Sequence, residues 1–210
     1  LYRDCLKFRY KFIPNIYSYA VNAVKTGEPL LRPLFYNDIK NEKLYDINTE
    51  FYLGDDILFA PVTGKDELKK EVYLPCGTWI DFWTKRVYEG DRNIMRSTPL
   101  LQKEGLPMFI RQGGGLAFQK DCTHLTDEIP DFLEIELYPD NFAKITLNES
   151  ENVTNEFSCE IKNGKIEITA QNNSDKQRVY KFSIFVNSKV YETEIAVDKN
   201  SAKKYELEIC

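Results

Sequence analysis

The chain has 210 residues, of which 42% are hydrophobic and 13% aromatic, and its formal net charge is −5. This composition is typical of a folded protein with room for one large domain or two small ones. The acidic balance gives no electrostatic reason to bind nucleic acid or an anionic membrane. Apolar runs are only a few residues long, so the sequence predicts no segment that spans a bilayer.

The cysteines are odd in number and far apart in the sequence. They are Cys5, Cys76, Cys122, Cys159 and Cys210. Without a CxxC pair or a set of histidines beside them, the pattern favours scattered reduced thiols over a zinc site, so we expect no metal. Reduced thiols favour a cytoplasmic location, while a secreted parent protein stays open. Because the chain opens on Leu1 within an apolar periodic pattern and not on Met, we expect a piece of a longer protein.

Residues 3–25 are predicted to form a helix. Apolar residues recur there at spacings of three and four, which gives one apolar face. These residues are Leu6, Tyr10, Ile13, Tyr17, Ala20 and Val24. Pro14 is expected to kink or restart the helix because it has no N–H to donate. Gly27 is expected to cap its end.

Residues 30–36 are predicted to form a short buried strand, followed by a polar stretch with a short helix near residues 46–53. After Ile57 the pattern changes to strands of four to eight residues with Pro and Gly between them, and no further helix is predicted. The expected strands are 70–74, 78–83, 93–97 and 108–112.

The triplet Gly113–Gly115 and the polar stretch up to Glu128 predict a domain boundary. Beyond it, apolar and polar residues alternate strictly in residues 133–137, 165–169 and 205–209. Strands with one buried and one exposed face are typical of an antiparallel sandwich. Between two such strands, Asn163-Gly164 predicts a tight hairpin turn.

Four segments carry a resemblance to a known family: FYLGDDILFAPV at 51–62, VYLPCGTWIDFW at 72–83, Arg32-Pro-Leu-Phe upstream and Pro-Met-Phe-Ile-Arg at 107–111. The helix adds a pattern of Arg9, Tyr10, Pro14 and Tyr17. Together they closely resemble the C-terminal part of glycoside hydrolase family 31, the α-glucosidase and α-xylosidase family, most strongly over residues 6–119.

The resemblance implies a mainly β fold in three parts. Residues 1–56 would be the end of a (β/α)8 barrel, contributing an outer helix and the last strand. Residues 57–120 and 121–210 would be two small antiparallel β-sandwich domains, proximal and distal. The chain would then be the C-terminal fragment of a retaining α-glucosidase that completes and buttresses the barrel. The parent would act on an α-linked oligosaccharide, without a cofactor.

Glycoside hydrolysis needs two carboxyl groups that face each other across the bond to be cleaved. The family's nucleophile and acid/base motifs have no match in this sequence, so we assign no catalytic residue and expect the chain alone to be inactive. Asp55-Asp56 fits a solvated turn, Asp81 a buried acceptor of hydrogen bonds, and His124 an exposed loop.

Arg32 is the candidate for substrate binding. By resemblance it lies on the last barrel strand, and the carboxyl ends of barrel strands face the active site. A guanidinium group there can pair with a sugar-binding or catalytic carboxylate. The alternative is a structural salt bridge at the rim of the barrel.

A different function also fits the sequence, namely a non-catalytic carbohydrate-binding or scaffold module. Exposed aromatic residues in the 79–83 cluster would favour this module, because aromatic faces stack on sugars. A large exposed apolar face on the first helix would favour the fragment, and would predict self-association through that helix.

Overall fold

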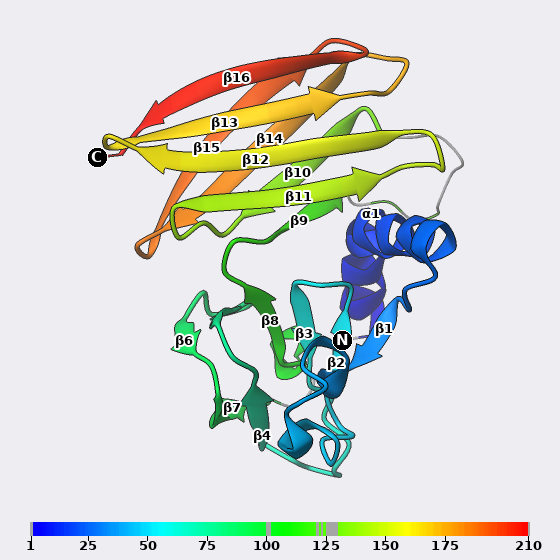
Figure 1. Ribbon diagram of the computed structural model, residues 1–210, viewed down its shortest axis with the longest axis vertical. Helices are drawn as coiled ribbons and strands as arrows, with labels where there is room; N and C mark the ends of the chain where they lie inside the picture. The colour runs from blue at the N-terminus through cyan, green and yellow to red at the C-terminus, as the bar shows by residue number, and fades with distance from the viewer. Residues whose placement is uncertain (1, 100–101, 121, 123, 125–129, 210) are drawn as a thin grey trace. The chain divides into compact units, whose positions relative to one another are not determined.

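The computed structural model describes residues 2–99, 102–120, 122, 124 and 130–209. The chain forms one α-helix, three short 3-10 helices and sixteen strands in the described residues (Figure 1). Contacts divide it into two compact units. The first unit comprises Leu1–Asp4 and Pro29–Gln112, and the second comprises Cys5–Glu28 and Gly113–Cys210. The mainly β fold expected from the sequence is confirmed.

The first unit contains a six-stranded antiparallel sheet. Its strands, in spatial order, are β1 (Leu31–Pro33), β2 (Phe51–Leu53), β3 (Ile57–Phe59), β8 (Met108–Arg111), β5 (Thr78–Asp81) and β6 (Val87–Glu89). Strands β4 (Lys69–Leu74) and β7 (Arg92–Ser97) pair with each other in a two-stranded sheet of their own. The 3-10 helices are η1 (Leu34–Asn37), η2 (Glu42–Leu44) and η3 (Lys103–Gly105).

The core of the first unit is built from both sheets and from η1 and η2. Trp79 of β5 is fully buried, and its ring stacks on Tyr52 of β2 at 6.0 Å between centroids. Val72 and Leu74 of β4 join the same cluster. Every second residue of β4 is buried, namely Lys70, Val72 and Leu74, because alternate side chains of a strand point to the same side.

The second unit is a sandwich of two four-stranded sheets. One sheet has the order β15 (Lys189–Val197), β14 (Arg178–Val186), β10 (Phe132–Leu137) and β9 (Gly115–Gln119). The other has the order β11 (Phe142–Asn148), β12 (Thr154–Lys162), β13 (Lys165–Asn172) and β16 (Ser201–Glu208). All neighbours are antiparallel except β10 and β14, which run parallel. The tight turn predicted at Asn163-Gly164 is present, with φ of 51° and 74°.

Helix α1 (Tyr2–Thr26) lies for most of its length in the second unit, where it covers one edge strand of each sheet (Figure 1). The side-chain amide of Asn15 donates to the carbonyl of Ala117 on β9 at 2.6 Å, and its oxygen accepts from the same residue's N–H at 2.9 Å. Ser18 accepts from the N–H of Asn148 on β11 at 2.8 Å. An uncovered edge strand is a site of unwanted pairing, so the helix protects the sandwich.

The sequence predicted that Pro14 would kink or restart the helix. Helix α1 runs through Pro14 without a restart, and its ribbon is bent along its length (Figure 1). A proline in a helix leaves the carbonyl four residues earlier without its usual donor. That carbonyl belongs to Tyr10, and it accepts a hydrogen bond from the side-chain amide of Gln119 at 2.9 Å. The sandwich therefore supplies the donor that the proline lacks. Gly27 caps the helix as predicted, with φ of 78° and its N–H bonded to Ala23.

The apolar face predicted for this helix is not its buried face. Tyr17 and Val24 are exposed, and the other members of the predicted face are half-buried. The buried residues are Phe12, Asn15, Ser18 and Val21. Periodicity failed here because two of the four buried side chains are polar and were not counted. The self-association expected through this helix stays a prediction.

Most predicted strands are confirmed in position, including those at 70–74, 93–97 and 133–137. The helix predicted near residues 46–53 is wrong, since 51–53 is strand β2. The strand predicted at 30–36 is shorter, because 34–37 forms η1. Part of the stretch up to Glu128 lies outside the described residues, and the three-part division at 56/57 and 120/121 stays a prediction. No described helix is long and apolar enough to cross a membrane.

Replacing Asn15 by Ala tests how the helix is held. The change leaves the N–H and the carbonyl of Ala117 without partners, and we expect a loss of about 2–4 kcal/mol in the free energy of unfolding. Urea unfolding followed by circular dichroism at the helix band measures it. Asn22→Ala on the same helix is the matched control, because it makes the same change in helix propensity. Equal losses in the two variants would contradict the role assigned to Asn15.

Candidate functional site

Arg32, the residue expected to bind substrate, is buried and fully engaged within the first unit. Its Nε donates to the carbonyl of Pro29 at 2.8 Å, and its Nη1 pairs with Oδ1 of Asp55 at 2.5 Å. The guanidinium also lies 5.1 Å from the centre of the Tyr36 ring. These contacts fasten β1 to the turn between β2 and β3, as the salt-bridge alternative expects. A role in sugar binding stays a prediction.

Asp55 and Asp56 have separate surroundings although they are adjacent in sequence. Asp55 is 66% exposed and pairs with Arg32. Asp56 is more enclosed, and burial raises the pKa of its carboxyl from 3.8 to about 6. The charge of Asp55 adds to the rise, while the nearby Arg111 opposes it. The two side chains therefore hold the β2–β3 turn with different partners and do not form a matched pair.

Asp81 is completely buried at the end of β5, and its carboxylate is used by four donors. Its Oδ1 accepts from the backbone N–H groups of Trp83 and Thr84, both at 2.9 Å. Arg96 of β7 donates from Nε to Oδ2 and from Nη2 to Oδ1, the latter at 3.5 Å. The carboxylate ties the six-stranded sheet to the two-stranded one, which is a structural role.

The aromatic cluster at 79–83 is core and not an exposed platform. Trp79 is fully buried, with its Nε1 donating to the carbonyl of Pro75 at 2.7 Å. Trp83 is half-buried, and its Nε1 donates to the carbonyl of Leu106 at 2.7 Å. Phe82 is 8% exposed and packs edge-on against Trp83. The side chains considered for stacking on a sugar are instead used to build the first unit.

The remaining reactive side chains do not assemble into a metal or nucleophile site in the described part of the chain. His124 lies in an exposed bend. Burial raises the pKa of the Cys159 thiol to about 12, so the group stays a thiol. No group of three or more His, Cys, Asp or Glu residues with metal-binding geometry occurs among the described residues.

A pocket of about 520 Å³ lies between the segment 43–50 and the β4–β7 pair, within the first unit. Its volume is in the range of small-molecule sites. Charged groups line it from several sides, namely Lys43, Asp46, Glu50 and Glu71. The other polar residues of the lining are Asn48, Thr49, Tyr73 of β4 and Asn93 of β7.

Glu50 is the unusual member of this lining. The residue is only 6% exposed, and one carboxyl oxygen, Oε1, accepts the N–H of Tyr73 at 3.0 Å. The other oxygen, Oε2, is buried without a hydrogen-bond partner. Burial raises the pKa of the carboxyl from 4.5 to about 7; the Tyr73 N–H and Lys70 oppose the rise, and Glu71 adds to it. Sequence reasoning missed Glu50 because it stands in a polar stretch without a motif, and the adjacent strand at 51–53 was not recognised.

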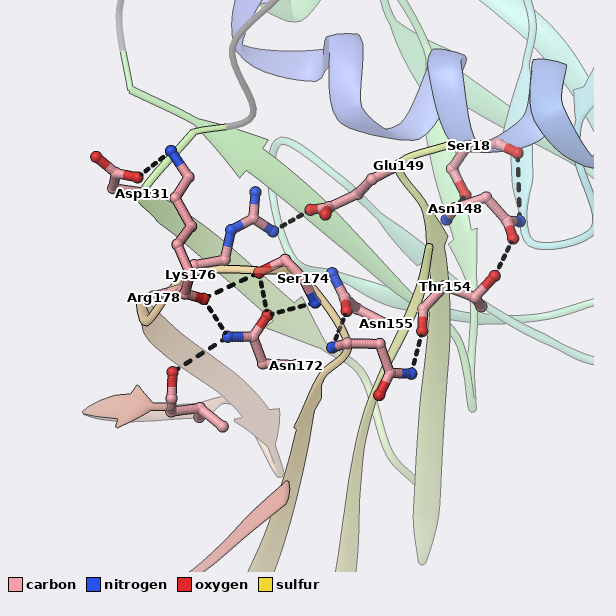
Figure 2. Close-up of polar contacts among 12 residues, drawn as sticks. Ser18, Asp131, Asn148, Glu149, Thr154, Asn155, Asn172, Ser174, Lys176 and Arg178 are labelled. Atoms are coloured by element: carbon pink, nitrogen blue, oxygen red, sulfur yellow. Dashed lines mark hydrogen bonds and ion pairs between the residues drawn. The ribbon is translucent and has the colours of Figure 1, made fainter. Parts of the chain in front are cut away.

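A second polar cluster closes one end of the sandwich in the second unit (Figure 2). Arg178 is 1% exposed and pairs with Glu149, which links the start of β14 to the turn after β11. Burial raises the pKa of Glu149, and Arg178 opposes that rise. Asn172 accepts from the hydroxyl of Ser174 at 2.6 Å and donates to the carbonyl of Lys176 at 2.9 Å. These bonds hold the β13–β14 loop in place, so we interpret the cluster as structural.

Comparison with known proteins agrees with this architecture. Residues 27–114 match the family model of the glycosyl hydrolase family 31 C-terminal domain. Alpha-glucosidase 2 of Bacillus thermoamyloliquefaciens is 28% identical over 209 residues, which cover 93% of this chain and 26% of that protein. An alpha-xylosidase of Saccharolobus solfataricus is 31% identical over 153 residues, covering 72% of this chain and 20% of that protein.

Among solved structures, a family 31 dextranase of Flavobacterium johnsoniae complexed with glucose shares the fold, with a TM-score of 0.84 at 19% identity. The likeness covers 98% of this chain and 32% of the dextranase chain. Residues 27–114 therefore carry the C-terminal domain of glycosyl hydrolase family 31, as their match to that family's model shows. The chain spans about a quarter of the length of the curated relatives that it matches.

Replacing Asp81 by Asn tests its structural role. Arg96 would be left buried without a full countercharge, and breaking a buried ion pair costs about 3–5 kcal/mol. Urea unfolding followed by tryptophan fluorescence reports on the first unit, because both tryptophans lie in it. Asp66→Asn, at an exposed position, is the control and is expected to leave stability unchanged within about 0.5 kcal/mol. An Asp81→Asn variant as stable as that control would contradict the assignment.

The raised pKa of Glu50 predicts a pH dependence of stability. Between pH 4.5 and about 7 the folded chain binds more protons at Glu50 than the unfolded chain does, so this group lowers stability as the pH rises. Glu50→Gln removes that effect, and we expect its stability relative to the parent to rise by about 3 kcal/mol between pH 4 and pH 8. Tryptophan-detected urea unfolding at several pH values measures it. A stability difference between Glu50→Gln and the parent that does not change with pH would count against a buried carboxyl.

Proposed function

We propose that this chain is the C-terminal part of a retaining α-glucosidase-type glycoside hydrolase, in which it completes and buttresses the catalytic barrel. The reacting carboxylates would come from elsewhere in the protein. The observation that carries the proposal is the match of residues 27–114 to the family's C-terminal domain.

The use of carboxylates in this chain supports a non-catalytic role. A retaining enzyme needs a nucleophile and an acid/base about 5 Å apart, both free to contact the sugar. Asp81 is saturated by four donors, and Asp55 is held by Arg32. Asp56 is enclosed beside Arg111 at a turn. These groups stabilise the first unit and are therefore not available as a reacting pair.

The substrate proposed for the whole protein is an oligosaccharide with a terminal α-linked glucose. Relatives named for glucosides and for xylosides both match this chain, so the sugar is chosen by parts of those proteins that it does not cover. Free cysteines at 5, 76, 122 and 159 support a cytoplasmic location as part of the same proposal.

The second candidate is a non-catalytic scaffold or carbohydrate-binding module. The buried Trp79 and half-buried Trp83 remove the aromatic platform on which a sugar-binding sandwich was expected to rely. The two hydrophobic cores favour a scaffold over a carbohydrate-binding module. A scaffold module differs from the first candidate only in what the rest of the protein does.

Hydrolysis of an aryl α-glucoside separates these candidates. The 210-residue chain alone is expected to release only background aryl alcohol. A polypeptide that also contains the residues encoded before Leu1 is expected to be active, and nuclear magnetic resonance of the first product should show the α-anomer, as retention requires. Turnover by the chain alone that disappears in Asp56→Asn would contradict the proposal. An inactive longer polypeptide that is folded would favour the scaffold.

A further inference from the structure

Two buried carboxylates of the first unit, Asp81 and Glu50, differ in how many hydrogen-bond donors surround them. Asp81 and Glu50 both reach the β4–β7 pair, the first through Arg96 and the second through the N–H of Tyr73. Every oxygen of Asp81 has donors, whereas Oε2 of Glu50 has none. A buried polar atom without a partner costs about 1–3 kcal/mol, so such an atom beside a pocket is an indication of a ligand.

The lining of the pocket beside Glu50 contains positive and negative side chains, and it contains hydrogen-bond donors as well as acceptors. The charged groups of the lining include the ammonium of Lys43 and the carboxylates of Asp46 and Glu71. The amide groups of Asn48 and Asn93 can each donate and accept hydrogen bonds. Because the pKa of Glu50 is about 7, its carboxyl is present in both protonation states near neutral pH and can also donate or accept. A mixed lining of this kind matches ligand groups that both donate and accept hydrogen bonds.

Charged ligands fit this lining less well than neutral ones. An anion would meet the carboxylates of Asp46 and Glu71. A metal ion needs a compact set of ligands, and no set of three suitable side chains occurs in the described residues. An organic cation would be attracted by Asp46 and Glu71, but Lys43 in the lining and Lys70, whose charge acts on Glu50, oppose that attraction. A hydroxyl group is neutral and serves as donor and acceptor at once.

We propose that the pocket formed by residues 43–50 and the β4–β7 pair binds a neutral hydroxyl-rich ligand, a glucosyl unit of an α-linked oligosaccharide. The Glu50 side chain would turn so that Oε2, which is buried in the unliganded chain, accepts a hydrogen bond from one of the ligand's hydroxyl groups. The choice of an α-glucoside among such ligands rests on the proposed function. The preference for a neutral polyol rests on the pocket alone. The site would hold a sugar chain without cleaving it.

The test is a titration of the 210-residue chain, labelled with ¹⁵N, with isomaltotriose and separately with maltotriose. We expect saturable shifts of the Asn48, Tyr73 and Asn93 amide signals at millimolar sugar. Glu50→Gln keeps the size of the side chain and an acceptor for Tyr73, and it is expected to weaken binding about tenfold or more through loss of a charge-assisted hydrogen bond. Glu89→Gln, an exposed change in the same unit, is expected to bind like the parent.

Other outcomes overturn the proposal in distinct ways. Shifts by inorganic phosphate or Mg²⁺ at these amides, without shifts by either sugar, would show a charged ligand. Shifts by myo-inositol but by neither oligosaccharide would overturn the α-glucoside and leave a polyol site. No saturable shift by any of these probes would overturn the site. If Glu50→Gln does not fold, as its amide spectrum would reveal, Asn93→Ala at the exposed side of the pocket takes its place, and unchanged binding there would also overturn the site.

The titration can fail or succeed separately from the hydrolysis assay that tests the hydrolase proposal. Binding is measured on a chain that is expected not to hydrolyse glycosides, so an inactive longer polypeptide would leave a positive titration standing. Conversely, an active longer polypeptide together with a negative titration would overturn the pocket and leave the hydrolase proposal intact.

Discussion

The first unit depends on joining two sheets that have separate backbone ladders. Strands β4 and β7 pair with each other, and the larger sheet is built from six other strands. Apolar side chains such as Val72 and Trp79 supply the common core, but they have no directional preference. The directional contacts between the sheets come from buried carboxylates. Asp81 binds Arg96, and Glu50 accepts a hydrogen bond from the N–H of Tyr73. A buried carboxylate is stabilising only when donors surround it, as they surround Asp81 and not Glu50, so the link between Asp81 and Arg96 is the one that fixes where the β4–β7 pair can lie.

In the second unit, polar side chains likewise form hydrogen bonds at the edges of the sheets. Helix α1 covers β9 and β11 through Asn15 and Ser18, whose side chains bond to the backbone groups that an edge strand leaves open. Gln119 of β9 in turn supplies the donor that Pro14 cannot provide. In both units, polar side chains therefore complete hydrogen bonding at places where a backbone ladder ends. Side chains engaged in this way have little freedom left for chemistry, which agrees with the supporting role proposed for this chain.

Local patterns in the sequence were enough to predict much of the fold. Alternation in residues 133–137 and the Asn163-Gly164 turn gave a strand and a hairpin that the structure contains, because both signals are local. The buried face of α1 was missed because the residues that it contacts, Ala117 and Asn148, are 102 and 130 residues away in sequence from Asn15 and Ser18. Glu50 was missed for the same reason, since only the folded chain places it beneath Tyr73 and beside a pocket.

The state of the Glu50 carboxyl is the centre of this account, since burial, the link to β4 and the pocket all meet there. A direct measurement is the pH titration of its side-chain carboxyl ¹³C signal in the 210-residue chain, assigned by comparison with Glu50→Gln. We expect a midpoint at about pH 7, because burial is the main influence on this group. A midpoint near 4.5, the ordinary value, would place the carboxyl in water and contradict both the buried link and the site built on it.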